Sequence, residues 1–309
     1  MTSISTSAFY NLSIANMDKI TQATQNLSQQ LSTGNKLTHS YDDPVAAAQM
    51  RTMQAADTLS TADTANASAA KASLSLTDST LSQFTNIITQ IQTLATQAAS
   101  DTTNTTDKAN IGTQISAYYQ QLVDLSNTKD SYGNYVFSGT SGSTPAYTQD
   151  SSGNATYTGG SSASAISLGG SLSVTPSVTG PEVMDFTTSG GVSGNLLTTV
   201  KTLADQLTAG TATSDTMNAS GGTFDQLTAA LNQVSATQTV VGARSAWITT
   251  ATTVQTTAQT ARTSTEATVG GTDYTTATAQ LSQQMLALSA SQASFAKLSS
   301  MSLFTYINN

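Results

Sequence analysis

MDKITQATQNLSQQL (residues 17–31) places its apolar side chains at alternating steps of three and four residues. A second run near the other end of the chain, residues 281–295, has the same spacing. In each run one position of the pattern holds a polar residue instead, Thr24 in the first and Gln292 in the second. A narrow apolar stripe of this kind favours a partner helix over a globular core. We therefore expect two terminal helices that pair and form an assembly surface, through Met17, Ile20, Leu27, Leu31, Leu281, Met285, Leu288 and Phe295.

The composition supports burial of polar surface in an assembly. Only 9% of the 309 residues are charged, against about 25% in ordinary soluble domains. The polar surface must therefore come from Ser, Thr, Asn and Gln. Burial of these uncharged groups against a neighbouring subunit costs less free energy than burial of a charged group. A low-complexity bias of the source organism is the alternative explanation.

Charge and hydropathy exclude several classes of partner. The net charge is −8 and no basic cluster exists, which argues against nucleic acid. No apolar run reaches the length of a membrane span, and we expect no membrane partner. Cysteine is absent, so neither disulfides nor thiolate sites are possible. The N-terminal residues lack the basic and apolar regions of a cleavable signal.

Catalysis is not expected. His39 is the only histidine and sits in a polar loop, away from any arrangement that would activate a nucleophile. Asp42 and Asp43 precede Pro44, and this order is better explained as a helix start than as a carboxylate pair or metal site. We predict helix-capping roles for these three residues, no enzyme activity, no metal and no cofactor.

The sequence pattern predicts helices on both sides of a central segment with short strands. Periodicity predicts helices over residues 9–33, 44–99, around 111–125, 196–207, 223–269 and from 272 or 273 to 302, with Gly34 ending the first. Residues 131–194 are rich in Gly, Ser and Thr. Strands are expected at 135–137 and 155–158, with a Gly-Gly hairpin joining 166–168 to 172–174. Disorder is the alternative for this insert.

These elements predict a mainly α protein with a small β insert, in which the two ends of the chain form a long coiled-coil-like rod. We expect terminal helices at 1–40 and 272–309, a helical rod domain at 41–130 and 195–271, and an inserted β-rich domain at 131–194. Rare charges in neutral helices often pair across an interface, so Arg51 and Arg244 are predicted to make polar contacts between subunits.

Four separated motifs resemble the bacterial flagellin superfamily. They are LSTGNKL (31–37) followed by DDPVAAA (42–48), VGAR (241–244), DY (273–274) and the segment from residue 281 onward. Three details resemble the proteins of this superfamily that join hook to filament: Pro44 after the Asp pair, YVFSG (135–139), and the ending SLFTYI (302–307), which adds Leu303 and Phe304 to the predicted assembly surface. His39 and Ser40 depart from the basic loop residues common in the superfamily.

The resemblance implies export through the flagellar type III channel without a cleaved signal, and terminal segments that order only on assembly. It implies a structural subunit at the hook–filament junction, in the flagellum outside the cell. The implied partners are copies of the same chain, another hook-associated protein on the hook side, filament flagellin on the distal side and a cytoplasmic export chaperone. Two alternatives stay open: a filament flagellin that self-polymerises, and a secreted binding module carried by the insert.

Overall fold

The computed structural model describes residues 6–100 and 102–307, with side chains from residue 8 to residue 297 apart from position 101. The chain divides into two compact units, residues 1–58 with 257–309 and residues 59–256. Its helices are α1 (Thr6–Thr33), α2 (Pro44–Ala98), α3 (Thr105–Ser126), α4 (Gly180–Met184), α5 (Leu196–Thr208), α6 (Ser214–Asn218), α7 (Thr223–Gly270) and α8 (Tyr274–Ile307).

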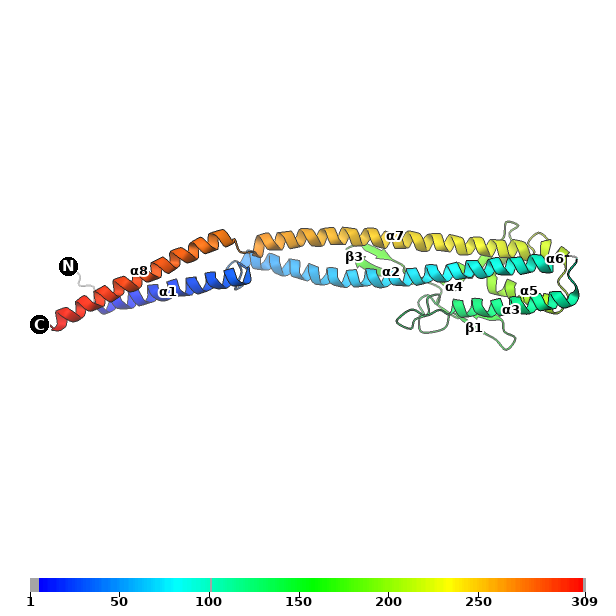
Figure 1. Ribbon diagram of the computed structural model, residues 1–309, viewed down its shortest axis with the longest axis horizontal. Helices are drawn as coiled ribbons and strands as arrows, with labels where there is room; N and C mark the ends of the chain where they lie inside the picture. The colour runs from blue at the N-terminus through cyan, green and yellow to red at the C-terminus, as the bar shows by residue number, and fades with distance from the viewer. Residues whose placement is uncertain (1–5, 101, 308–309) are drawn as a thin grey trace. The chain divides into compact units, whose positions relative to one another are not determined.

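The first unit holds α1 and α8 together with the first part of α2 and the last part of α7. Figure 1 shows α1 and α8 side by side. At one end of the helix pair, backbone hydrogen bonds join the segment after α1 to the connection between α7 and α8: Lys36 N donates to Gly270 O at 2.7 Å, and Thr272 N donates to Gly34 O at 2.9 Å. Gly34 ends α1 with a φ of 72°, a left-handed conformation that glycine adopts without steric cost.

The second unit has a continuous apolar core. The heptad residues of α2, Leu81, Phe84, Ile88 and Ile91, are fully buried, and Phe84 meets Phe137 edge-on with ring centroids 5.9 Å apart. Helices α3 and α5 pack closely along their length. The predicted helix periodicity therefore marks the core side of these helices.

The α3–α5 contact depends on Gly112. A Cβ added there would lie 2.9 Å from Ala204 O and 2.7 Å from Thr208 Oγ1 on α5. By contrast, a Cβ at Gly242 on α7 would meet nothing within 4 Å. Gly112 therefore permits the close approach of α3 and α5, whereas Gly242 has no such role.

Gly112→Ala should lower the free energy of unfolding by about 1–3 kcal/mol, because α5 must move away from α3. Gly242→Ala should raise it by about 0.4–1 kcal/mol, because alanine is the better helix former and restricts the unfolded chain. Urea unfolding followed by circular dichroism measures both. Equal shifts of the same sign in the two variants would contradict the close approach at Gly112.

The β insert consists of three separate two-stranded antiparallel hairpins. They are β1 (Tyr147–Gln149) with β2 (Ala155–Tyr157), β3 (Ile166–Gly169) with β4 (Leu172–Val174), and β5 (Asp185–Thr187) with β6 (Ser193–Asn195). The predicted Gly-Gly hairpin is confirmed, with positive φ at Gly169 and Gly170. Fold class is confirmed as mainly α with a small β insert.

One local prediction differs from the structure, and two short helices of the structure were not predicted. Residues 135–137 form a turn with isolated bridges rather than a strand, because Val136 and Phe137 bury their side chains without a neighbouring strand to pair with. The short helices α4 and α6 were not expected. Both are five residues long and depend on local caps, the Thr179–Glu182 and Thr213–Thr216 capping boxes, rather than on apolar periodicity.

Two turns of the insert are built alike. Residues 130–134 read DSYGN and residues 150–154 read DSSGN. In each, the first aspartate accepts backbone N–H groups from the third and fifth residues at 2.8–2.9 Å, and the glycine has a φ of 84° or 76°. The turns differ mainly at the third position, where Tyr132 stands in one and Ser152 in the other.

Candidate assembly surface

The α1–α8 pair packs along a heptad seam. On α1, Tyr10, Met17, Ile20, Leu27 and Leu31 are half-buried, in the frame that the spacing predicts. At one end of the seam, Tyr10 and Phe295 meet edge-on with ring centroids 5.4 Å apart. The predicted residues of α1 thus lie against α8 within one chain.

On α8 the seam follows a different frame from the predicted one. Leu281, Leu288 and Phe295 are half-buried, but the intermediate seam positions are Gln284 and Ser291 rather than Met285 and Gln292. Met285 is 56% exposed. Steps of three and of four residues both return to nearly the same helix face, so sequence spacing alone permits either frame. The side chains of Leu303 and Phe304 lie outside the described residues.

Apolar residues outside the seam remain uncovered in the described part of this unit. On α1, Phe9, Leu12 and Ile14 are 41%, 61% and 46% exposed, and on α8 Leu286 is 72% exposed beside Met285. Few charges interrupt these helices, which carry mainly Ser, Thr, Asn and Gln between the apolar positions. A helix pair with apolar side chains on its outer faces is suited to packing against further helices.

The loop before α2 uses its two aspartates differently. Asp43 caps the helix, since its Oδ1 accepts the Ala46 N–H at 3.0 Å. Asp42 instead accepts the His39 N–H at 2.7 Å and the Thr38 hydroxyl at 2.9 Å, which lowers the pKa of the Asp42 carboxyl. Pro44 is the first residue of α2. The pair therefore closes the loop and starts the helix.

The two arginines predicted to join subunits have different surroundings. Arg51 is exposed on α2. Arg244 is half-buried, and its Nη1 donates to the Ser177 carbonyl at 3.0 Å within the same chain. Arg244 therefore fixes the insert against α7, and a contact between subunits would have to use the rest of its guanidinium group.

A third arginine, Arg262, lies in a charged cluster that the sequence analysis did not predict. Arg262 on α7 donates from Nε to Asp57 on α2 at 2.8 Å, and from Nη2 to Gln259 at 2.5 Å. Its hydrogen bond lowers the pKa of Asp57. Burial raises the pKa of Glu266, and the Asp57 carboxylate beside it raises it further. This cluster ties α2 to α7 in the first unit.

Glu266→Gln should remove a pH dependence of stability. Because the folded state raises the pKa of Glu266, its contribution is complete below the ordinary value of 4.5 and is lost as pH rises through the raised pKa. Asp57 acts in the opposite direction, but only near and below its ordinary value of 3.8. From about pH 4 to about pH 7, Tm of the wild type should therefore fall relative to that of the variant.

Thermal unfolding of both proteins across this range, in one buffer series, provides the measurement. Asp18→Asn, which removes a negative charge from an exposed position on α1, is the matched control. An equal effect of this control would assign the pH dependence to net charge rather than to the cluster.

Features of an enzyme site do not converge in the described part of the chain. His39 is exposed, with its ring stacked on Tyr41. Among the residues described, no group of three or more His, Asp or Glu side chains is placed to hold a metal ion. Of the helices described, none combines the length and apolar character of a membrane span.

Comparison with known protein families agrees with the helical N-terminal part of the chain. Residues 4–142 match the bacterial flagellin N-terminal helical region. This N-terminal part of the chain is flagellin-like. The resemblance noted from the sequence motifs is confirmed, and it points to a structural flagellar family rather than to an enzyme family.

Two curated relatives carry the name flagellar hook-associated protein 3. The chain is 32% identical over 122 residues to that of Escherichia coli, which is 40% of this chain and 38% of the relative. It is 29% identical over 150 residues to that of Salmonella typhimurium, which is 48% of this chain and 47% of the relative. The chain thus matches less than half the length of either relative.

Solved structures share the fold. Flagellar hook-associated protein 3 from Legionella pneumophila has a TM-score of 0.63 at 17% identity, covering 71% of this chain and 98% of that one. The flagellar junction protein from the same organism has a TM-score of 0.56 at 17% identity, covering 65% and 99%. At this identity the likeness concerns the fold alone.

Proposed function

We propose that this chain is a structural subunit of the bacterial flagellum that forms the layer between hook and filament. The observation that carries the proposal is the match of part of the chain to relatives named flagellar hook-associated protein 3. The α1–α8 pair supports it, because a helix pair with uncovered apolar side chains is suited to assembly.

Binding energy in this layer comes from the outer faces of the terminal helices. Each Å² of apolar surface that neighbouring copies cover contributes about 25 cal/mol, less the cost of ordering the segments. We propose that residues 1–40 and 272–309 adopt their helices when they meet these neighbours. On the hook side the partner is another hook-associated protein, and on the distal side it is filament flagellin.

Delivery to this position is by the flagellar type III channel, with a cytoplasmic chaperone that covers the apolar termini before export. The absence of cysteine is compatible with this route, because a chain that threads a narrow channel cannot carry crosslinks. The proposed location is the flagellum outside the cell.

Seeded polymerisation of the purified protein separates the junction role from that of a filament flagellin. A junction subunit should not elongate from seeds, should bind at hook ends and should then accept flagellin, as seen by light scattering and negative-stain microscopy. Long filaments that lengthen with time would replace the junction role with that of a flagellin. Failure both to bind at hook ends and to elongate from seeds would overturn the flagellar role.

A further inference from the structure

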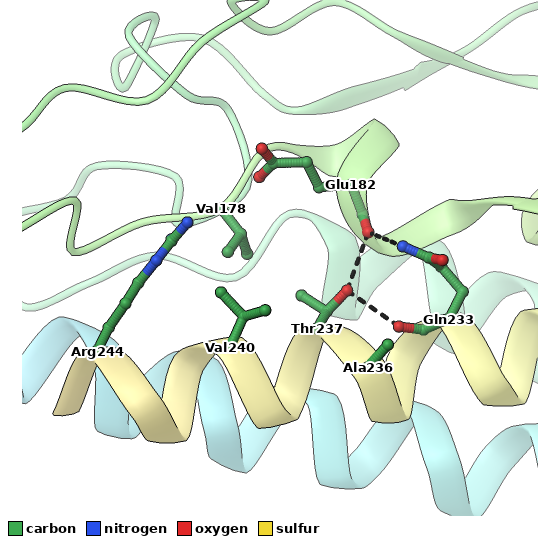
Figure 2. Close-up of a pocket in the computed structure, with 7 residues that line it drawn as sticks. All are labelled: Val178, Glu182, Gln233, Ala236, Thr237, Val240 and Arg244. Atoms are coloured by element: carbon green, nitrogen blue, oxygen red, sulfur yellow. Dashed lines mark hydrogen bonds between the residues drawn. The ribbon is translucent and has the colours of Figure 1, made fainter. Parts of the chain in front are cut away.

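A groove lies between α7 and the segment that leads into α4. Its floor is apolar, made by Val178, Ala236 and Val240, and its volume is about 290 Å³. Figure 2 shows Val178 and Val240 facing each other, with the Arg244 guanidinium and the Glu182 carboxylate on the same side of the groove as Val178. This volume is at the lower limit for ligand pockets and is suited to a single side chain.

The groove is held in shape by the chain itself. The Glu182 carbonyl accepts hydrogen bonds from the Thr237 hydroxyl at 2.9 Å and from Gln233 Nε2 at 2.7 Å. Arg244 donates to Ser177 O at the other end. Val240 is nevertheless 45% exposed. The walls are therefore fixed and Val178 is buried between them, while Val240 and Ala236 on α7 stay exposed.

Tyr132 is an exposed aromatic side chain that could enter this groove in another copy of the chain. It is 77% exposed, so it does not fill the groove of its own chain. Its turn is fixed by Asp130, which accepts the N–H groups of Tyr132 and Asn134, so docking would order little additional backbone. The equivalent turn carries Ser152 at this position, which shows that the turn itself does not require an aromatic residue.

Tyr132 and the groove both belong to the second unit, and backbone contacts connect their segments. The chain from the Tyr132 turn leads to Phe137, whose carbonyl accepts the Gly180 N–H at 2.8 Å, and Ser138 is bridged to Thr179. Thr179 and Gly180 lie between two lining residues of the groove, Val178 and Glu182. Each copy therefore presents both the aromatic side chain and its receptor.

We propose that Tyr132 of one copy docks in this groove of the next copy. The ring would cover the exposed side chains of Val240 and Ala236, the Arg244 guanidinium would contact the ring face, and the phenol would donate to Glu182. Because two different surfaces meet, the contact is heterologous and repeats from copy to copy around a layer. The inference rests on the proposed function, since it requires copies arranged side by side in the flagellum.

Crosslinking in assembled flagella tests this contact. The chain lacks cysteine, so Tyr132→Cys combined with Val240→Cys introduces the only two thiols, which a short bismaleimide can join. We expect a ladder of crosslinked oligomers, at least tenfold more abundant than with the control pair Ser152→Cys and Val240→Cys. Each single variant should give no ladder.

A second measurement separates docking from folding. Tyr132→Ser recreates the DSSGN sequence of the equivalent turn, so Tm should stay unchanged while fewer hooks retain filaments. A flagellum that contains the chain but gives no ladder, or gives one equally with the control pair, would overturn the docking contact alone. Absence of the chain from purified hook–filament preparations would overturn the proposed function as well.

Discussion

Replacement of Leu12 or Leu286 by glutamate should strongly reduce filament attachment without unfolding the protein. Both leucines are largely exposed on the α1–α8 pair, so the isolated chain should lose little stability. In an assembly each would be covered, and loss of one buried leucine removes about 1.5–3 kcal/mol. Burial of an unpaired carboxylate adds a further cost. Incorporation should therefore fall by more than about tenfold.

The measurement is a count of hooks with attached filaments in a deletion strain that expresses each variant. Gln22→Glu introduces the same charge at an exposed polar position of α1 and is the matched control. Full attachment with Leu12→Glu and Leu286→Glu would show that these outer faces stay in contact with water. Equal loss with Gln22→Glu would indicate a general effect of charge on export or solubility.

Phe84→Ala should lower the free energy of unfolding of the second unit by about 3–5 kcal/mol, the usual cost of removing a fully buried phenylalanine ring. Phe84 and Phe137 are both fully buried and contact each other edge-on. The cavity would therefore open between α2 and the turn that leads into the insert. This is a large share of the stability of a typical domain.

Denaturant unfolding monitored by circular dichroism measures this loss. Tyr132→Ala removes an aromatic ring from the same part of the chain, but from an exposed position, and should change stability by no more than about 0.5 kcal/mol. If Phe84→Ala matched this control, the Phe84–Phe137 contact would not fix the insert to the helices.

The apolar pattern along the chain was sufficient to predict the main helices. The boundaries of α1 and α2 follow from Gly34 and Pro44, since a glycine with positive φ ends a helix at low cost and proline starts one. The heptad residues at 17–31 mark the face of α1 that packs against α8, and those at 81–91 mark the face of α2 that is buried in the core. These features are local, because each depends on residues within one or two turns.

Only the tertiary structure determined which of two possible frames α8 uses, because Met285 and Gln284 are both compatible with the spacing from Leu281. Likewise, nothing in the sequence paired Asp57 with Arg262, since a separation of 205 positions along the chain places no constraint on that contact. The groove at Val240 and the exposure of Tyr132 also arise from segments distant in sequence. Local periodicity thus determined the elements, whereas the contacts between distant segments determined the surfaces available for assembly.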